Sequence, residues 1–290
     1  MPDRGAAGGA RRLAVVGSPI EHSLSPVLQG AAARELGLAW RYERRLVAAG
    51  ELAGFVDVLD GSWLGLSVTA PLKEEALALS ASVDARAERT GAVNTLLLGA
   101  RVRGWNTDVG GIVRAFADAG LASVSSGAIA GAGATAQSAL LAMAELGAER
   151  VTVALRTPAK GARLEALGER LGVAVVLQGL DEALPAVDAA VSTLPAAADV
   201  VPAFAHPPRR MLDADYARAG GSRYGTSVPA DRMIDGREML LGQAVLQARI
   251  FALGDVDAPL PDEARVADAM RAALLEAAAG ARASDSLEES

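Results

Sequence analysis

Alternating strand-like and helical segments are the feature that most restricts the fold of this chain. Short runs with strand character occur at residues 13–17, 40–46, 63–69, 127–130, 151–155, 173–176, 189–194 and 210–213. Helical patterns separate many of them, beginning with residues 27–36 and 50–59. Strands joined through helices pair in parallel, so the sequence predicts an α/β protein built on parallel sheets.

Length and charge restrict the classes of function. A chain of 290 residues is long enough for two domains, each with its own core. A formal net charge of −7, without a long basic run, argues against nucleic acid or an anionic membrane surface as the main partner. The chain has no cysteine, and its only histidines are His22 and His206, so neither a disulfide nor a zinc site is expected.

The N-terminal residues carry no apolar core of a signal peptide, and no segment has the uninterrupted apolar length that spans a bilayer. These two absences lead us to expect a cytoplasmic protein. Residues 1–10 and 283–290 are small or polar and show no packing pattern, so both are expected to be flexible tails.

Residues 64–75 carry an ionisable group at the end of a buried strand. Pro71 suits the first position of the helix that follows, with Thr69 or Ala70 as the cap, which puts Lys73 in the first turn. The helix macrodipole and partial burial both disfavour an ammonium there, so the pKa of Lys73 is expected to fall toward the range useful for proton transfer. The alternative is a lysine that is merely solvated.

Other polar residues admit a local and a functional interpretation. Ser25 can cap the helix at 27–36, whereas Ser23 has no such role. Asn94 lies in an otherwise apolar strand, where a buried amide must find partners. Asp108 stands at the entrance to a helix over 112–119, either as its N-cap or as the ionised partner of a desolvated lysine. Gln243 interrupts an apolar helix, facing either solvent or a site.

Residues 127–150 have the pattern of a nucleotide-binding turn. The strand at 127–130 is followed by a glycine-containing turn at 131–136 and by a helix. Such a turn lets backbone amides and the helix N-terminus approach a pyrophosphate. The next strand ends at Arg156 and Thr157 rather than at an acidic residue, which favours the 2′-phosphate of NADP over the ribose hydroxyl of NAD. Lys160 is a further cation there or a solvated helix residue.

Taken together, these motifs resemble the shikimate dehydrogenase family over about residues 13–252. The segment 17–26 is similar to its substrate-loop motif, and 67–73 is similar to the motif with its catalytic lysine. Residues 91–95 and 106–108 match the motifs that supply a substrate-binding asparagine and the aspartate beside the lysine.

The resemblance implies catalysis by Lys73 and Asp108. It also implies that the two serines of the substrate loop hold the substrate carboxylate. The substrate-binding residues it indicates are Ser23, Ser25, Ser67, Thr69, Asn94, Tyr216 and Gln243. The NADP-binding residues expected are Gly131, Ala132, Gly133, Ala134, Thr135, Ala136, Arg156, Thr157, Lys160, Thr193 and Gly236. No metal is expected.

The chain also departs from the family pattern. Ser67 replaces the usual asparagine but keeps a hydroxyl, and Gln29-Gly30 replaces a common His-Asn pair. Ala134 stands for the third glycine of the nucleotide turn. Leu155 removes an amide near the adenosine, which is expected to loosen the preference for NADP. Glu238 replaces a glycine near the nicotinamide, where its carboxylate either disfavours the hydride-donating complex or points to solvent.

The implied fold has two domains. A mainly parallel α/β substrate domain is expected over 11–111 and 239–280, with a Rossmann-type NADP-binding domain inserted over 112–238 and C-terminal helices returning to the substrate domain.

The implied activity is reversible reduction of the 3-keto group of 3-dehydroshikimate by NADPH, giving shikimate in the chorismate pathway of aromatic amino-acid biosynthesis. The only partner expected is this small-molecule substrate, and the protein is expected to be a monomer or a homodimer.

Two alternatives stay open. One is a quinate/shikimate or aminoshikimate-type dehydrogenase, which shares the motifs and differs in details of the pocket. The other is a non-catalytic NADP-binding sensor on the same fold. Retention of both Lys73 and Asp108 argues against the sensor, which has no need of a proton-transfer pair.

Overall fold

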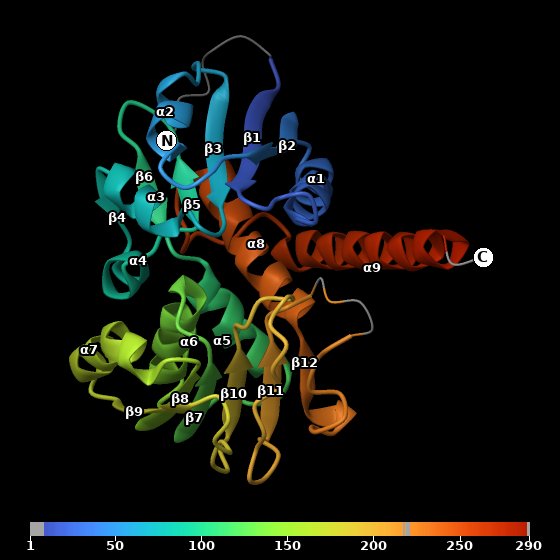
Figure 1. The fold of residues 1–290 in the computed structure, drawn as a ribbon. Helices are drawn as coiled ribbons and strands as arrows, with labels where there is room; N and C mark the ends of the chain where they lie inside the picture. Colours follow the sequence, from blue (N-terminus) through green and yellow to red (C-terminus); the bar gives the residue numbers. More distant parts are fainter. Residues whose placement is uncertain (1–8, 217, 219–220, 289–290) are drawn as a thin grey trace. The chain divides into compact units, whose positions relative to one another are not determined.

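The computed structural model describes residues 9–216, 218 and 221–288, with side chains described up to residue 280. The chain divides into two compact units, drawn together in Figure 1. The first comprises the chain up to residue 87, residues 92–107 and the chain from residue 244 onward. The second comprises residues 88–91 and 108–243. Both are α/β, as predicted.

The first unit contains a mixed sheet. Its strands are β1 (Arg11–Gly17), β2 (Trp40–Leu46), β3 (Trp63–Val68), β4 (Ser82–Val83), β5 (Thr95–Leu97) and β6 (Arg103–Trp105), in the order β2-β1-β3-β5-β6-β4. β1 runs parallel to β2 and β3, while β5 is antiparallel to β3 and β6. The parallel part therefore places the carboxyl ends of β1 and β3 at one edge.

Helices cover this sheet through its alternating apolar side chains. They are α1 (Ser25–Glu35), α2 (Leu52–Asp57), α3 (Lys73–Leu79), α4 (Ala85–Thr90), α9 (Glu263–Glu288) and the C-terminal part of α8 (Gly236–Leu253). Val16, Leu66 and Val68 pack with residues of α2, α3 and α4, whereas Leu13 packs with Phe251 of α8. Neighbouring residues of β1 thus face opposite sides of the sheet, as strand geometry requires.

The second unit contains a fully parallel sheet. Its strands are β7 (Ser126–Ala130), β8 (Arg150–Leu155), β9 (Ala174–Gly179), β10 (Ala189–Ser192), β11 (Arg210–Asp213) and β12 (Met233–Asp235), in the order β12-β11-β10-β7-β8-β9. The direction of winding reverses between β7 and β10. In open parallel sheets, ligands bind beyond the carboxyl ends of the strands at such a switch point.

The two faces of this second sheet are covered differently. α5 (Asp108–Asp118), α6 (Ala134–Glu145) and α7 (Ala162–Leu171) pack on one face over Ile129, Val153 and Val191. The other face carries Ala128, Ala190 and Met211, and loop residues cover it. Between β9 and β12, the 3-10 helix Ala230–Arg232 is the only helical turn in the described residues. In the described residues, helices therefore cover one face of this sheet and loops cover the other.

The boundary between the units differs from the predicted one. Residues 88–91 were expected in the substrate domain but group with the second unit, and the same is true of residues 108–111 and 239–243. The reason for these last two ranges is close packing of α5 on α8: a Cβ at Gly111 would lie 2.7 Å from the carbonyl oxygen of Met239. The division therefore falls within α8, after Gln243.

Several helix starts also differ from their predictions, and three of them concern the site. Ser25 is the first residue of α1 and Leu24 is the N-cap, so Ser25 does not cap the helix. α3 begins at Lys73 after the N-cap Leu72, because residues 69–72 form a turn in which Leu72 N donates to the Thr69 carbonyl oxygen at 3.0 Å. α5 begins at Asp108, four residues earlier than expected.

The ends of the chain were only partly predicted. Residues 283–288 were expected to be part of a tail, but α9 continues to Glu288, since alanine, arginine, leucine and glutamate dominate its sequence and are good helix formers. Residues 1–8 and 289–290, the rest of the predicted tails apart from Gly9 and Ala10, lie outside the described residues. None of the described helices combines the length and apolarity that crossing a membrane requires.

Candidate active site

The loops that follow β1 and β3 lie side by side. Ser18 N donates to the carbonyl oxygen of Ala70 at 3.0 Å, and Thr69 N donates to that of Val16 at 2.9 Å. Gly17 permits this approach, because a Cβ there would collide with the side chain of Thr69. The fold thus joins the predicted substrate loop to the segment that leads into Lys73.

Ser23 and Ser25, the predicted carboxylate-binding serines, are brought together within the substrate loop. Ser23 Oγ donates to Ser25 Oγ at 3.3 Å, and Ser25 N donates to Ser23 Oγ at 3.4 Å. Arg44 of β2 holds the loop from the side, since its Nε donates to the Ser23 carbonyl oxygen at 2.8 Å. The two hydroxyls therefore form one polar patch.

A hydrogen-bonded network runs across the sheet of the first unit. Tyr42 Oη donates to Ser67 Oγ at 2.6 Å, and Ser67 Oγ donates to Gln247 Oε1 at 2.7 Å. Gln247 Nε2 then donates to Thr95 Oγ1 at 3.0 Å and to the carbonyl oxygen of Asn94 at 3.2 Å. Burial raises the pKa of Tyr42 far above its usual range, although a hydrogen bond to Ser67 opposes the shift. The phenol is therefore a neutral donor at any physiological pH.

Asn94 finds the partners that its burial demands. It lies one residue before β5, and its Oδ1 accepts from Thr107 N and from Thr95 Oγ1, both at 2.9 Å. Its Nδ2 donates to Thr107 Oγ1, also at 2.9 Å. These bonds fix the orientation of the amide and anchor the residue that directly precedes Asp108.

Sequence reasoning missed Tyr42 and Gln247 as members of this network. Tyr42 shares a face of β2 with Trp40, and both pack with the apolar cluster around Leu13, so strand alternation was an available signal. Gln247 follows Gln243 by four residues on one helix, a spacing that could also have been noticed. Gln243 Nε2 donates instead to the Leu240 carbonyl oxygen at 2.8 Å, within its own helix.

The two predicted catalytic residues each begin a helix. Lys73 is half-buried at the start of α3, and its carbonyl oxygen accepts from Val93 N at 3.0 Å. Asp108 begins α5 and is 5% exposed. Lys73 belongs to the first unit, whereas Asp108, Gln243 and the half-buried Tyr216 belong to the second. Their roles stay predictions.

The glycine turn after β7 has the geometry that a dinucleotide phosphate requires. Gly131 has φ +116°, and a Cβ there would collide with the Thr193 hydroxyl. Thr193 N and Oγ1 both donate to the carbonyl oxygen of Ala130, at 2.8 and 3.0 Å. Gly133 is the N-cap of α6, which begins at Ala134. The turn and Thr193 therefore meet at the switch point, where backbone amides can face an anion.

Replacement of Gly131 by alanine is expected to lower the free energy of unfolding by about 2 kcal/mol, because an L-residue is strained at this positive φ. The added methyl also displaces Thr193, so the Kd for NADP should rise. Urea unfolding and fluorescence titration with NADPH would measure these two effects. Gly133→Ala is the control for stability, since its φ is −80° and a Cβ there meets no atom within 4 Å. Equal stability of the two variants would contradict the prediction.

The end of β8 presents the predicted adenosine-side cations to solvent. Arg156 and Thr157 are exposed, as is Lys160 in the 3-10 helix Pro158–Gly161. Leu155 is only 3% exposed and belongs to the core. A Cβ at Gly161 would lie 2.9 Å from Leu155 Cδ1. The Leu155 side chain therefore points into the core, and its effect on the preference for NADP stays a prediction.

Gly236 is needed where α8 begins. A Cβ at this position would lie 2.5 Å from the carbonyl oxygen of Asp213 at the end of β11. Asp235 Oδ1 accepts from Arg237 N at 2.9 Å and so caps the helix. Glu238 lies half-buried in the first turn, where a carboxylate interacts favourably with the helix dipole. No cluster of metal-ligating side chains occurs among the described residues.

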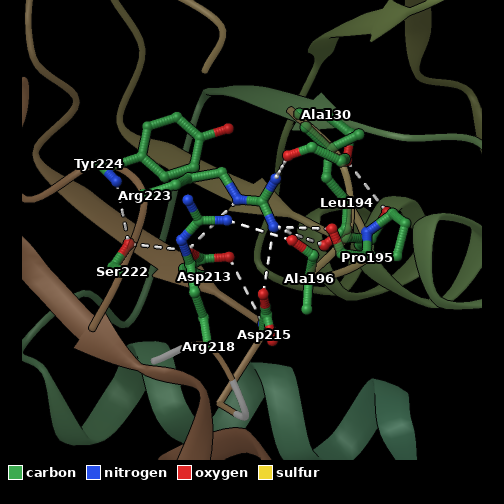
Figure 2. Close-up of polar contacts among 12 residues, drawn as sticks. Ala130, Leu194, Pro195, Ala196, Asp213, Asp215, Arg218, Ser222, Arg223 and Tyr224 are labelled. Atoms are coloured by element: carbon green, nitrogen blue, oxygen red, sulfur yellow. Dashed lines mark hydrogen bonds and ion pairs between the residues drawn. The ribbon is translucent and has the colours of Figure 1, made fainter. Parts of the chain in front are cut away.

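Arg223 occupies the centre of a second polar cluster, shown in Figure 2. Its side chain is fully buried, and its Nη atoms donate to the carbonyl oxygens of Leu194, Pro195 and Ala198 at 2.9–3.1 Å. Nη2 also bonds Asp215 Oδ2 at 3.2 Å. The cation thus ties the segment that follows Thr193 to the segment that leads to Tyr216. Nothing in the sequence pattern singled out this arginine.

Comparison with known proteins identifies relatives of this chain. Residues 15–96 match the protein-family profile described as the shikimate dehydrogenase substrate binding domain. A shikimate dehydrogenase (NADP(+)) of Methanothermobacter thermautotrophicus is 38% identical over 161 residues. That match covers 54% of this chain and 57% of the relative, so it spans little more than half of the relative's length.

Solved structures extend the similarity to nearly the whole chain. The crystal structure of Mycobacterium tuberculosis shikimate dehydrogenase has a TM-score of 0.73 and 34% identity, covering 92% of this chain and 99% of that one. A shikimate 5-dehydrogenase from Thermus thermophilus, in complex with NADP(H) and shikimate, has a TM-score of 0.74 and 31% identity, covering 91% and 99%. The chain belongs to the shikimate dehydrogenase family.

Proposed function

We propose that this protein is an NADP-dependent oxidoreductase that reversibly reduces the 3-keto group of 3-dehydroshikimate to the hydroxyl of shikimate, in the chorismate pathway. The observation that carries the proposal is the contact of Ser18 with Ala70, which joins the serine-bearing loop to the loop that leads into Lys73. Relatives named shikimate dehydrogenase and the Thermus complex with NADP(H) and shikimate support it.

In this proposal different groups hold the carboxylate and the 3-hydroxyl of the substrate. The Ser23 and Ser25 hydroxyls receive the carboxylate, while Lys73 binds the 3-hydroxyl and supplies or takes up its proton. Asp108 acts as the partner carboxylate of the lysine. NADPH, when bound, supplies the hydride. The remaining substrate-binding residues proposed are Ser67, Thr69, Asn94, Tyr216 and Gln243.

The proposed cofactor contacts belong to the second unit. The turn at 131–133 and the first residues of α6, 134–136, present backbone amides to the pyrophosphate, and Thr193 and Gly236 shape the carboxyl edge of the sheet around it. Arg156, Thr157 and Lys160 take the 2′-phosphate, for which a guanidinium is a better partner than a carboxylate. Their exposure after β8 is compatible with this role.

Arg156→Gln is expected to lower kcat/KM for NADP about thirtyfold, as the loss of a charged hydrogen bond implies. The value for NAD should hardly change, because NAD has no 2′-phosphate. The ratio of the two kcat/KM values measures the effect. Arg150→Gln, at the opposite end of β8, removes the same charge and serves as the control. If Arg156→Gln left the ratio unchanged, a residue other than Arg156 would have to bind the 2′-phosphate.

The proposed function is tested by absorbance at the reduced-nicotinamide band. Purified protein is offered shikimate or quinate together with NADP or NAD, in all four pairings. Turnover confined to shikimate and NADP is the expected result. A preference for quinate would establish the quinate/shikimate alternative, and no turnover in any pairing would favour the NADP-binding sensor.

The proposal also covers the oligomeric state of the protein and its location in the cell. The protein is proposed to act as a monomer or a homodimer in the cytoplasm, on a small molecule alone. Size-exclusion chromatography with light scattering would distinguish the two assemblies.

A further inference from the structure

The side chain of Arg44 lies on the same face of the first sheet as the polar network. Arg44 pairs with Val15, and Val15 pairs in turn with Ser67. Residues in register on parallel strands direct their side chains to one face. Tyr42 stands two positions earlier on β2 and so shares that face, as its bond to Ser67 shows. Arg44 thus lies two residues beyond Tyr42 on β2, closer to the carboxyl edge of the sheet.

At this edge Arg44 contacts the substrate loop directly. Its Nε donates to the Ser23 carbonyl oxygen at 2.8 Å, and the Ser23 hydroxyl bonds that of Ser25. Within the described part of the chain, the Nη groups of Arg44 have no hydrogen bond or ion pair. The guanidinium is therefore fixed at one nitrogen, while its other donors stay available beside the serine pair.

The carboxylates that neighbour Arg44 in sequence and in the substrate loop bond other groups. Glu43 pairs with Arg12 at 3.1 Å and with Arg45 at 2.8 Å. Glu21, the acidic residue of the substrate loop, accepts from Ile20 N at 3.0 Å through its carboxylate. The positive charge of Arg44 consequently has no compensating partner in the described residues.

We propose that Arg44 is a specificity-determining residue that attracts and orients the carboxylate of the substrate at the Ser23–Ser25 pair. This inference rests on the proposed function. Two serine hydroxyls can donate hydrogen bonds, but they bring no charge to balance an anion. A guanidinium supplies that charge together with a planar pair of donors that matches a carboxylate. The site therefore selects an anionic ring acid over its neutral derivatives.

The test compares Arg44→Gln and Arg44→Lys with the control Arg41→Gln. Arg41 is exposed on the same strand and faces the opposite side of the sheet, so its variant makes the same change in net charge. Arg44→Gln should raise KM for shikimate about tenfold, as expected for loss of a charged hydrogen bond in a partly exposed site. KM for NADP and kcat should stay unchanged. Arg44→Lys should recover part of the loss.

Two further readouts exclude a merely structural effect. Raising the ionic strength should weaken shikimate binding in the wild type and in Arg41→Gln, but much less in Arg44→Gln. The methyl ester of shikimate, which lacks the charge, should bind all variants equally in calorimetric titrations. Equal KM values for shikimate in Arg44→Gln and Arg41→Gln would overturn the inference.

The inference and the proposed function fail in different ways. A wild type that binds shikimate or quinate without turnover would refute the proposed function, and calorimetry would still decide the role of Arg44. A wild type that binds neither acid refutes both.

Discussion

Lys73→Ala is expected to lower kcat for shikimate oxidation about a thousandfold, the usual contribution of a positioned acid–base group. The variant lacks the amine that is proposed to take up the proton of the 3-hydroxyl as the hydride leaves. The Kd for NADPH should not change, because the proposed cofactor contacts belong to the other unit. Steady-state rates and fluorescence titration measure the two quantities separately.

The chain offers a matched control, since Lys160 is its only other lysine. Lys160→Ala removes the same charge from an exposed position after β8, so it should raise KM for NADP and leave kcat nearly intact. If Lys73→Ala turned over at a near-normal rate, Lys73 would not be the proton-transfer group.

Arg223→Met is expected to lower the free energy of unfolding by about 3–5 kcal/mol, the cost of removing one member of a buried ion pair. The variant removes the Arg223 cation from Asp215, and it removes the donors to the carbonyl oxygens of Leu194 and Pro195, seen in Figure 2, and to that of Ala198. Loops rather than helices cover this face of the sheet, so their carbonyl groups depend on such side-chain donors. Urea unfolding at neutral pH measures the loss.

The control for this second prediction is Arg209→Met. Arg209 pairs with Asp188 at 3.3 Å in the same unit, but its side chain is 66% exposed. Removing an exposed pair should cost less than about 1 kcal/mol. Equal unfolding midpoints for the two variants would show that Arg223 does not hold these loops together.

Features that depend on local periodicity were predictable from the sequence. Alternation of strands and helices indicated the parallel strands of both units, and the bounds expected for β2 and β11 agree with those observed. The positive φ of Gly131 agrees with the turn expected from its sequence. In each case neighbours along the chain determine the conformation, so sequence pattern was sufficient.

Features that depend on contacts distant in sequence were not predictable. Ser67 and Gln247 are 180 positions apart, and their bond exists only after α8 packs on the sheet. The start of α1 was mispredicted for a different, local reason: Ser25 has the residue type of a cap, but its backbone N–H donates to the Ser23 hydroxyl and Leu24 takes the cap position. The loops over the second sheet carry no periodicity that would have revealed Arg223.

The central claim is hydride transfer between NADPH and 3-dehydroshikimate, and isotopic transfer tests it most directly. The protein is incubated with 3-dehydroshikimate and NADPH that carries deuterium at the transferable position of the nicotinamide, and the product is examined by mass spectrometry and NMR. The account predicts shikimate with a single deuterium at carbon 3. Unchanged 3-dehydroshikimate, or shikimate without deuterium, would contradict it.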